Sequence, residues 1–126
     1  LNIINDQFSC PTCSQSLAEL CWKFVLLNQQ NSQFNFDNQL IYHFSDLGIT
    51  NWYELSLAIR KYGKDYSLLK DPAIIKPVSS LEYNSIAKRP KYSLLDNKDT
   101  IDKFEIKTSH WSENVKNIIK KIKLLS

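Results

Sequence analysis

The hydrophobic pattern along this chain switches between short apolar runs and helical spacing, which predicts an α/β arrangement. Three runs of strand length occur at 1–4, 40–44 and 73–78. Pro77 in the third run favours a sheet edge or a strand end, because proline cannot donate a ladder hydrogen bond. The polar segments at 5–13 and 28–38 are expected to be loops.

Helical spacing appears in four places. Ser16 and Glu19 have the spacing of a capping box before a helix at about 17–27, whose inner face would carry Leu17, Leu20, Cys21, Phe24 and Leu27. Asn51 with Glu54 predicts the start of a second helix, with Trp52, Leu55, Ile59 and Tyr62 inward and Gly63 closing it.

The last two helices follow a segment at 79–92 that lacks periodicity and is expected to be an ordered loop. Asp96 would cap a short helix with Asp99 in its first turn and Ile101 and Phe104 inward. A final helix from about Trp111 to Leu125 carries the stripe Trp111, Val115, Ile118, Ile119, Ile122 and Leu125. The pattern therefore predicts an α/β lobe with few short strands and about four helices.

Composition narrows the classes of partner. A chain of 126 residues fits one domain, and its net charge of +3 is too small and scattered to indicate nucleic acid. No apolar run approaches the roughly 18 residues that cross a bilayer, so no membrane partner is expected. Three cysteines without a secretory signal favour reduced thiols in a cytoplasmic protein.

Three motifs suggest chemistry, and each has a simpler explanation. Cys10 and Cys13 form a CxxC that could bind zinc or cycle as a redox pair with Cys21 or His43 nearby, but a second ligand pair of matching spacing is lacking. Tyr66 and Lys70 match Y-x-x-x-K, yet Asp71-Pro72 would end any helix there, so a solvent-facing connector is favoured. Four lysines make the last helix basic, and a solvated face is preferred over a membrane or nucleic-acid surface: Lys116, Lys120, Lys121 and Lys123.

The segment 82–96, EYNSIAKRPKYSLLD, resembles the E-Y-P-x-x-A-x-R-P-x-x-S-x-L-D block near the C-terminus of the dTDP-4-dehydrorhamnose reductase family, which are extended short-chain dehydrogenases/reductases. Other segments follow the family's order: 6–12 is similar to D-Q-x-G-x-P-T, 17–20 to the helix after it, 42–45 to Y-H-x-x-G, 51–55 to S-W-Y-x-F, and 104–106 to F-G-I before Trp111. The likeness covers essentially the whole chain.

Several positions depart from that family pattern. Glycine is replaced at Ser9, Asp46 and Glu105, and the two prolines of E-Y-P-x-P-A are Asn84 and Ile86. A glycine with positive φ resists replacement by serine or glutamate at a cost of about 1 kcal/mol. The loops are therefore expected to be shaped differently here, or the chain is a divergent or decaying copy.

The resemblance implies that residues 1–126 are the C-terminal substrate-binding lobe of such a reductase, and that the N-terminal Rossmann part lies outside the chain. The family reduces dTDP-4-dehydro-L-rhamnose to dTDP-L-rhamnose for cell-surface polysaccharide. Its NADPH or NADH and its catalytic Tyr and Lys would belong to the missing part, so this chain alone is expected to be inactive and to bind no cofactor. Only two glycines, far apart, preclude the usual dinucleotide cradle.

Four residues are the expected contacts to the dTDP-sugar: Gln7, Thr12, Arg89 and Tyr92. Arg89 suits a diphosphate because of its forked guanidinium, although Arg89-Pro90 could equally serve only to fix the loop. The other expected partner is the cofactor domain, whose absence would expose apolar surface and could permit a homodimer. Two alternatives stay open, namely a non-catalytic binding or regulatory relative and a small zinc-binding module on Cys10, Cys13 and Cys21.

Overall fold

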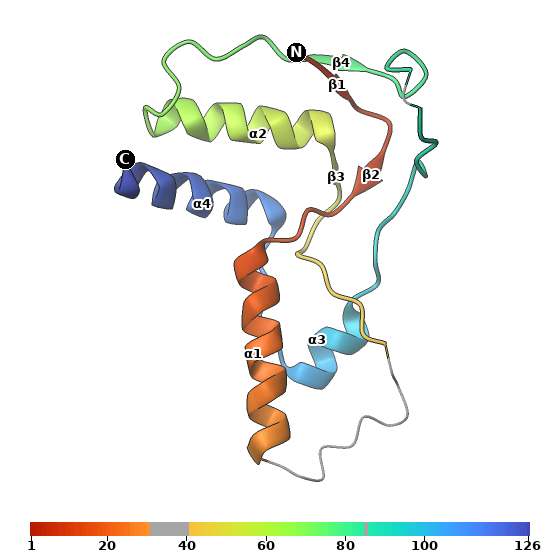
Figure 1. Cartoon of the computed structure of the whole chain (residues 1–126), viewed down its shortest axis with the longest axis vertical. Helices are drawn as coiled ribbons and strands as arrows, with labels where there is room; N and C mark the ends of the chain where they lie inside the picture. The colour runs from red at the N-terminus through yellow and green to blue at the C-terminus, as the bar shows by residue number, and fades with distance from the viewer. Residues whose placement is uncertain (31–40, 85) are drawn as a thin grey trace.

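The computed structural model describes residues 1–30, 41–84 and 86–126 (Figure 1). Its elements in chain order are β1 (Asn2–Ile4), β2 (Phe8–Ser9), α1 (Ser14–Gln30), β3 (Thr50–Asn51), α2 (Trp52–Asp65), β4 (Lys76–Val78), α3 (Lys98–Phe104) and α4 (Trp111–Leu125). Four helices with a few short strands confirm the predicted α/β class.

Two small sheets organise the chain. β1 pairs in parallel with β4, with Asn2 opposite Lys76 and Ile4 opposite Val78, and α2 connects the two strands along the chain. β2 pairs antiparallel with β3. In Figure 1, α2 and α4 lie side by side below β1 and β4, whereas α1 and α3 form the opposite end of an elongated molecule.

Few apolar side chains of the molecule are removed from solvent. Phe104, Trp111 and Ile119 are the buried apolar side chains among the described residues. The accessible surface is 9468 Å², whereas a compact monomer of 14.7 kDa exposes about 6,900 Å². The molecule therefore leaves faces open that a compact domain of this size would cover.

The first helix begins earlier than predicted. The Leu17 amide donates to the Cys13 carbonyl at 3.1 Å, so helical bonding starts before Ser16. The capping box at Ser16 and Glu19 is therefore wrong, and Ser16 lies inside α1. The loop expected at 28–38 is also wrong at 28–30, which are helical, and its remainder lies outside the described residues.

The strand predicted at 40–44 is wrong for the described residues 41–44. Instead of pairing with another strand, the backbone at 43–45 accepts hydrogen bonds from side chains of α3 and of the residue before α3. Thr100 Oγ1 donates to the His43 carbonyl at 2.5 Å, and Asn97 Nδ2 donates to the Ser45 carbonyl at 2.7 Å. The third predicted strand is confirmed in part, since β4 keeps only its last three residues.

The second helix confirms its predicted start. Asn51 Oδ1 accepts the Glu54 amide at 2.9 Å, which satisfies one of the unpaired donors of the first turn. Gly63 is not a terminator, because it is buried within α2 with a Leu69 side-chain carbon 2.6 Å from where a Cβ would lie. Of the expected inner face, Trp52 and Ile59 are exposed, so part of the apolar stripe of α2 lacks a partner within the described residues.

The two C-terminal helices follow the prediction closely. The N-cap of α3 is Asn97 rather than Asp96, although Asp96 Oδ1 does accept the Lys98 amide at 3.0 Å. Phe104 is buried as expected. α4 has the predicted bounds and buries Trp111 and Ile119, while its stripe residues Ile118, Ile122 and Leu125 stay exposed.

Replacing Glu105 with glycine should stabilise the chain by about 1 kcal/mol. Glu105 ends α3 in the left-handed region, with φ 47° and ψ 50°, where a Cβ is strained. Its carbonyl accepts from Lys23 Nζ at 2.8 Å, a bond that glycine would keep. Urea unfolding measures the gain. Asp102→Gly within the same helix is the control and should destabilise instead; a loss of stability in both variants would contradict the strain.

Candidate functional site

The carboxyl ends of the two parallel strands open into the two loops that carry candidate residues. β1 leads into 5–13 and β4 leads into 79–84. The Asn5 amide donates to the Val78 carbonyl at 3.0 Å, which extends the pairing past β1. Ligands of parallel sheets bind beyond the carboxyl ends of the strands, where successive loops meet. This edge is therefore the first place to look for a site.

Asp6 and Gln7 bind the β4 loop through a single serine. Asp6 Oδ1 accepts both the Ser80 amide, at 3.0 Å, and the Ser80 hydroxyl. Gln7 Nε2 donates to Ser80 Oγ at 3.0 Å. The Ser80 hydroxyl bond is the main cause that lowers the pKa of Asp6 below its ordinary value, so the carboxylate stays charged at neutral pH. Asp6 and Ser80 are absent from the contacts that the sequence predicts.

Further along the chain, residues 91–93 pair with Phe8 of the first loop, and we call this pairing of Phe8 with 91–93 the seam. The Phe8 amide donates to the Lys91 carbonyl at 2.8 Å, and the Ser93 amide donates to the Phe8 carbonyl at 2.9 Å. These bonds bring Tyr92 alongside Phe8 as a parallel bridge. The structure thus brings the Gln7 loop and the Tyr92 loop together, and Tyr92 is 60% exposed there. Arg89, three residues earlier, is exposed on the same loop.

The loop after β4 is held by hydrogen bonds between two of its own residues. The Ser79 amide and hydroxyl donate to Glu82 Oε2 at 2.7 and 2.8 Å. In turn, the Glu82 amide donates to Ser79 Oγ at 3.2 Å. The backbone bond from Ser79 is the largest cause that lowers the pKa of Glu82. The S-x-x-E pattern at 79–82 is the sequence signal from which this turn could have been predicted.

Asn84 shows how this loop differs from the reductase family pattern. Its φ is 48°, in the left-handed region. Proline, which stands there in that pattern, is fixed near φ −65° and could not adopt this conformation. Asparagine is among the residues that tolerate it best. The expectation that the loop is reshaped is thereby supported at this residue.

Thr12 lies outside the seam, in the segment that leads into α1. It is exposed, and its neighbour Cys13 donates its amide to Asp46 Oδ2 at 2.7 Å. Asp46 is only 2% exposed. Its Oδ2 also accepts from Asn114 Nδ2 at 2.8 Å, and its carbonyl accepts from the Cys10 thiol at 2.9 Å. One buried aspartate therefore joins the first loop to α4.

Of the three cysteine thiols, that of Cys10 has a structural role, since it donates to the Asp46 carbonyl. All three are free thiols, and Cys21 is exposed on α1. Burial, followed by the nearby Asp46, raises the pKa of Cys10, so its thiol stays protonated at neutral pH. Within the described ranges, no three His, Cys, Asp or Glu side chains gather closely enough to hold a metal ion.

The Y-x-x-x-K match does not form a catalytic pair on a helix. α2 ends at Asp65, so Tyr66 is its C-cap and Lys70 lies beyond. Ser67 has φ 58°, which turns the chain directly after the helix. The residues between Tyr66 and Lys70 are therefore not helical. This confirms the prediction that the segment is a connector after α2 and not part of a helix.

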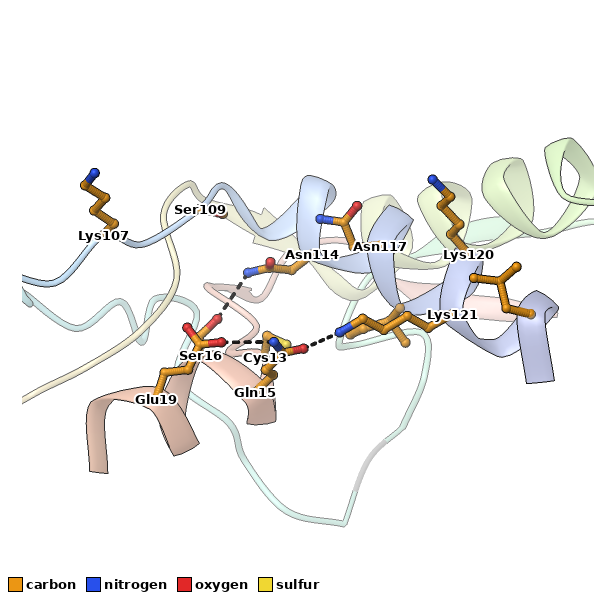
Figure 2. A pocket seen from close by; sticks show the side chains of 12 residues that line it. Cys13, Gln15, Ser16, Glu19, Lys107, Ser109, Asn114, Asn117, Lys120 and Lys121 are labelled. Carbon is orange, nitrogen blue, oxygen red and sulfur yellow. Dashed lines mark hydrogen bonds between the residues drawn. The ribbon is translucent and has the colours of Figure 1, made fainter. Parts of the chain in front are cut away.

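A polar cavity of about 440 Å³ lies between α1 and α4 (Figure 2). Lys121 Nζ donates to Gln15 Oε1 at 2.5 Å across it. In Figure 2 the ammonium groups of Lys107 and Lys120 point away from Lys121 rather than toward a common centre. None of the four candidate residues lines this cavity, and its cations are dispersed.

No helix among the described residues is long and apolar enough to cross a membrane.

The chain is similar to a known family of proteins over nearly its whole length. A family model described as the RmlD substrate binding domain matches residues 1–124. A dTDP-4-dehydrorhamnose reductase of Aggregatibacter actinomycetemcomitans is 26% identical over 120 residues, which is 94% of this chain and 39% of the relative. The spore coat polysaccharide biosynthesis protein SpsK of Bacillus subtilis is 30% identical over 120 residues, 94% of this chain and 36% of SpsK.

Solved structures agree on the fold. The crystal structure of dTDP-4-dehydrorhamnose reductase from Bacillus anthracis in complex with NADP superposes with a TM-score of 0.70 at 24% identity. The match covers 96% of this chain and 38% of that one. This chain thus spans about two fifths of the length of the relatives it matches.

Proposed function

Because the chain belongs to the RmlD substrate binding domain family, we propose that it forms the nucleotide-sugar wall of a dTDP-4-dehydrorhamnose reductase. The observation that carries this proposal is the seam of the Gln7 and Tyr92 loops at the carboxyl edge of β1 and β4. The rest of the reductase, with its Rossmann cofactor site, would come from polypeptide outside residues 1–126. On this proposal the chain alone has no reductase activity.

The seam residues have complementary roles in holding a dTDP-sugar. Arg89 is exposed and forked, which suits the diphosphate, and Tyr92 offers a ring and a hydroxyl to the nucleoside. Gln7 has its amide nitrogen bound to Ser80, so its carbonyl oxygen can face the ligand. Thr12 lies further along the same loop, where it is exposed.

The cofactor part would supply a hydride from NADPH or NADH to the C4 keto group. NADP is the nucleotide named with the Bacillus anthracis relative. What this chain contributes is orientation: a diphosphate held by Arg89 and a nucleoside held by Tyr92 would fix the sugar relative to the cofactor. The Asp6–Ser80–Gln7 bonds would keep the two loops at a constant separation while the ligand binds.

Arg89→Ala tests this assignment in a chimera in which residues 1–126 replace the matching part of the Aggregatibacter actinomycetemcomitans reductase. We expect the chimera to reduce dTDP-4-dehydro-L-rhamnose, and the substitution to raise KM about 10-fold or more, because a charged bond to the diphosphate is lost. The exposed neighbour Lys88→Ala is the matched control and should change KM less than about two-fold.

Equal KM values for Arg89→Ala, Lys88→Ala and the unaltered chimera would exclude the diphosphate contact. A chimera that binds dTDP with the expected Arg89 dependence but does not turn over would instead favour a non-catalytic relative. The reshaped loop at Asn84 is the observation that keeps this second function in view.

A further inference from the structure

Ser80 makes hydrogen bonds whose direction is fixed. Asp6 Oδ1 accepts from the Ser80 backbone amide at 3.0 Å and also from the Ser80 hydroxyl. A backbone amide can only donate, so the Asp6 atom that faces Ser80 must be an acceptor. The single proton of the Ser80 hydroxyl is therefore committed to Asp6, and the hydroxyl oxygen is left with lone pairs alone.

Gln7 takes its orientation from that oxygen. Its Nε2 donates to Ser80 Oγ at 3.0 Å, which is the bond that a hydroxyl without a spare proton can make with an amide. The nitrogen and oxygen ends of a glutamine amide have nearly the same shape, so the hydrogen-bond partners decide which end points where. Here the end turned away from Ser80 is the carbonyl oxygen. We call Asp6, Ser80 and Gln7 the Ser80 relay.

The carbonyl oxygen of Gln7 is left for an outside donor. In the described part of the chain, no group donates to Gln7 Oε1. The three relay residues are half-buried, and Gln7 directly precedes Phe8, which pairs with 91–93 in the seam. In a partly buried site, two acceptors that face each other both stay unsatisfied, which costs more than one net hydrogen bond gains. Gln7 should therefore distinguish sharply between a donor and an acceptor on a ligand.

We propose that Asp6 and Ser80 are positioning residues that make Gln7 an acceptor, so that this point of the site selects a hydrogen-bond donor of the ligand. The inference rests on the proposed function for the identity of the ligand, a dTDP-sugar. Such a ligand carries two kinds of donor, the N3–H of the thymine ring and the hydroxyl groups of the hexose. A ligand that presents an acceptor to Gln7 is rejected.

Binding of three ligands to the chimera with the Aggregatibacter actinomycetemcomitans reductase, measured by isothermal titration calorimetry, tests the relay. The ligands are dTDP, 5-methyl-dCDP, in which a bare nitrogen acceptor replaces the N3–H of thymine, and dTDP-L-rhamnose, which adds the hexose hydroxyls. Ser80→Ala should lower the affinity about 3–10-fold for ligands whose donor meets Gln7, and less than about two-fold for those without it. A reduced preference for dTDP over 5-methyl-dCDP identifies the thymine N3–H, whereas a reduced preference for dTDP-L-rhamnose over dTDP identifies a sugar hydroxyl.

Further variants separate positioning from simple support of the loops. Asp6→Asn keeps an acceptor oxygen and should retain the unaltered selectivity, whereas Asp6→Ala frees the Ser80 proton to reach Gln7 and should lose selectivity as Ser80→Ala does. Ser79→Ala is the matched control, because Ser79 binds Glu82 and not the relay. It should change the affinity for all three ligands by one common factor. Equal losses for all three ligands in Ser80→Ala and Asp6→Ala would overturn the relay.

Nuclear magnetic resonance of residues 1–126 without ligand examines the relay independently of the proposed function. The side-chain amide protons of Gln7 should exchange with solvent several-fold more slowly than those of the exposed Gln29, and Ser80→Ala should remove the difference. Equal exchange of Gln7 and Gln29 in the unaltered chain would overturn the relay even where the chimera binds dTDP. A chimera that binds none of the three ligands would instead overturn the proposed function, and the choice of ligand with it, whatever the exchange rate of Gln7.

Discussion

Asp46→Ala should lower the free energy of unfolding by about 2–4 kcal/mol. The side chain is 2% exposed and accepts from the Cys13 amide and from Asn114 Nδ2. Alanine removes the acceptor of both part-buried donors, leaving Asn114 only its longer bond to Ser16 Oγ, and it also removes a negative charge from the N-terminus of α1. Such a loss is a large share of the roughly 5–15 kcal/mol that stabilises a domain.

Urea unfolding followed by far-ultraviolet circular dichroism measures this loss, with Asp102→Ala as the matched control. Asp102 is an exposed aspartate on α3, and its removal should change stability by less than about 0.5 kcal/mol. Asp46→Asn should fall between the two, because one amide oxygen can still accept from Cys13 while the new NH₂ faces the Asn114 donor. Asp46→Ala and Asp102→Ala with the same midpoint would show that the buried aspartate does not organise the fold.

Asp46 also shows what a pattern of sequence positions cannot reveal. In the family pattern this position is a glycine, so the sequence alone predicts a reshaped loop or a decaying copy. The left-handed non-glycine residues of the described chain are Ser67, Asn84 and Glu105, so Asp46 is unstrained. Its carboxylate instead binds partners 33 and 68 residues away in the sequence. Only the tertiary fold reveals that the substitution adds contacts.

Local signals predict the elements whose stability is local. Asn51 with Glu54 indicates the start of α2, and the apolar spacing of 111–125 indicates the bounds of α4. The same S-x-x-E pattern occurs at Ser16 and at Ser79, yet only the second forms capping bonds. The first fails because the Asp46 bond to the Cys13 amide lets α1 begin a turn earlier.

The candidate site is predictable as two loops but not as one seam. Gln7 and Tyr92 can be chosen from the motifs that contain them, whereas their proximity depends on the parallel pairing of β1 and β4. Asp6 and Ser80 are 74 residues apart, so no spacing rule connects them. The strand expected at 40–44 fails in its described residues for a related reason, because Thr100 of α3 and Asn97 just before it bind the carbonyls of His43 and Ser45.

Phe104→Ala should destabilise the chain by about 3–5 kcal/mol. Phe104 is 2% exposed, and its ring centroid lies 5.0 Å from that of Tyr42 and 5.8 Å from that of Phe24. It therefore joins α3 to α1 and to the segment 41–44, which has no strand ladder of its own. An apolar cavity of about 340 Å³ already adjoins these rings, so truncation enlarges a space that the surroundings fill poorly.

The cost should fall on this end of the molecule and spare the seam. Phe104→Leu should recover about half of the lost stability, and Leu81→Ala, at a side chain 91% exposed, should change it by less than about 0.5 kcal/mol. In the folded chimera at low temperature, Phe104→Leu should leave KM for the nucleotide sugar unchanged, because Arg89 and Tyr92 belong to a different loop. A KM increase comparable to that of Arg89→Ala would mean that the core between α1 and α3 also shapes the proposed nucleotide-sugar site.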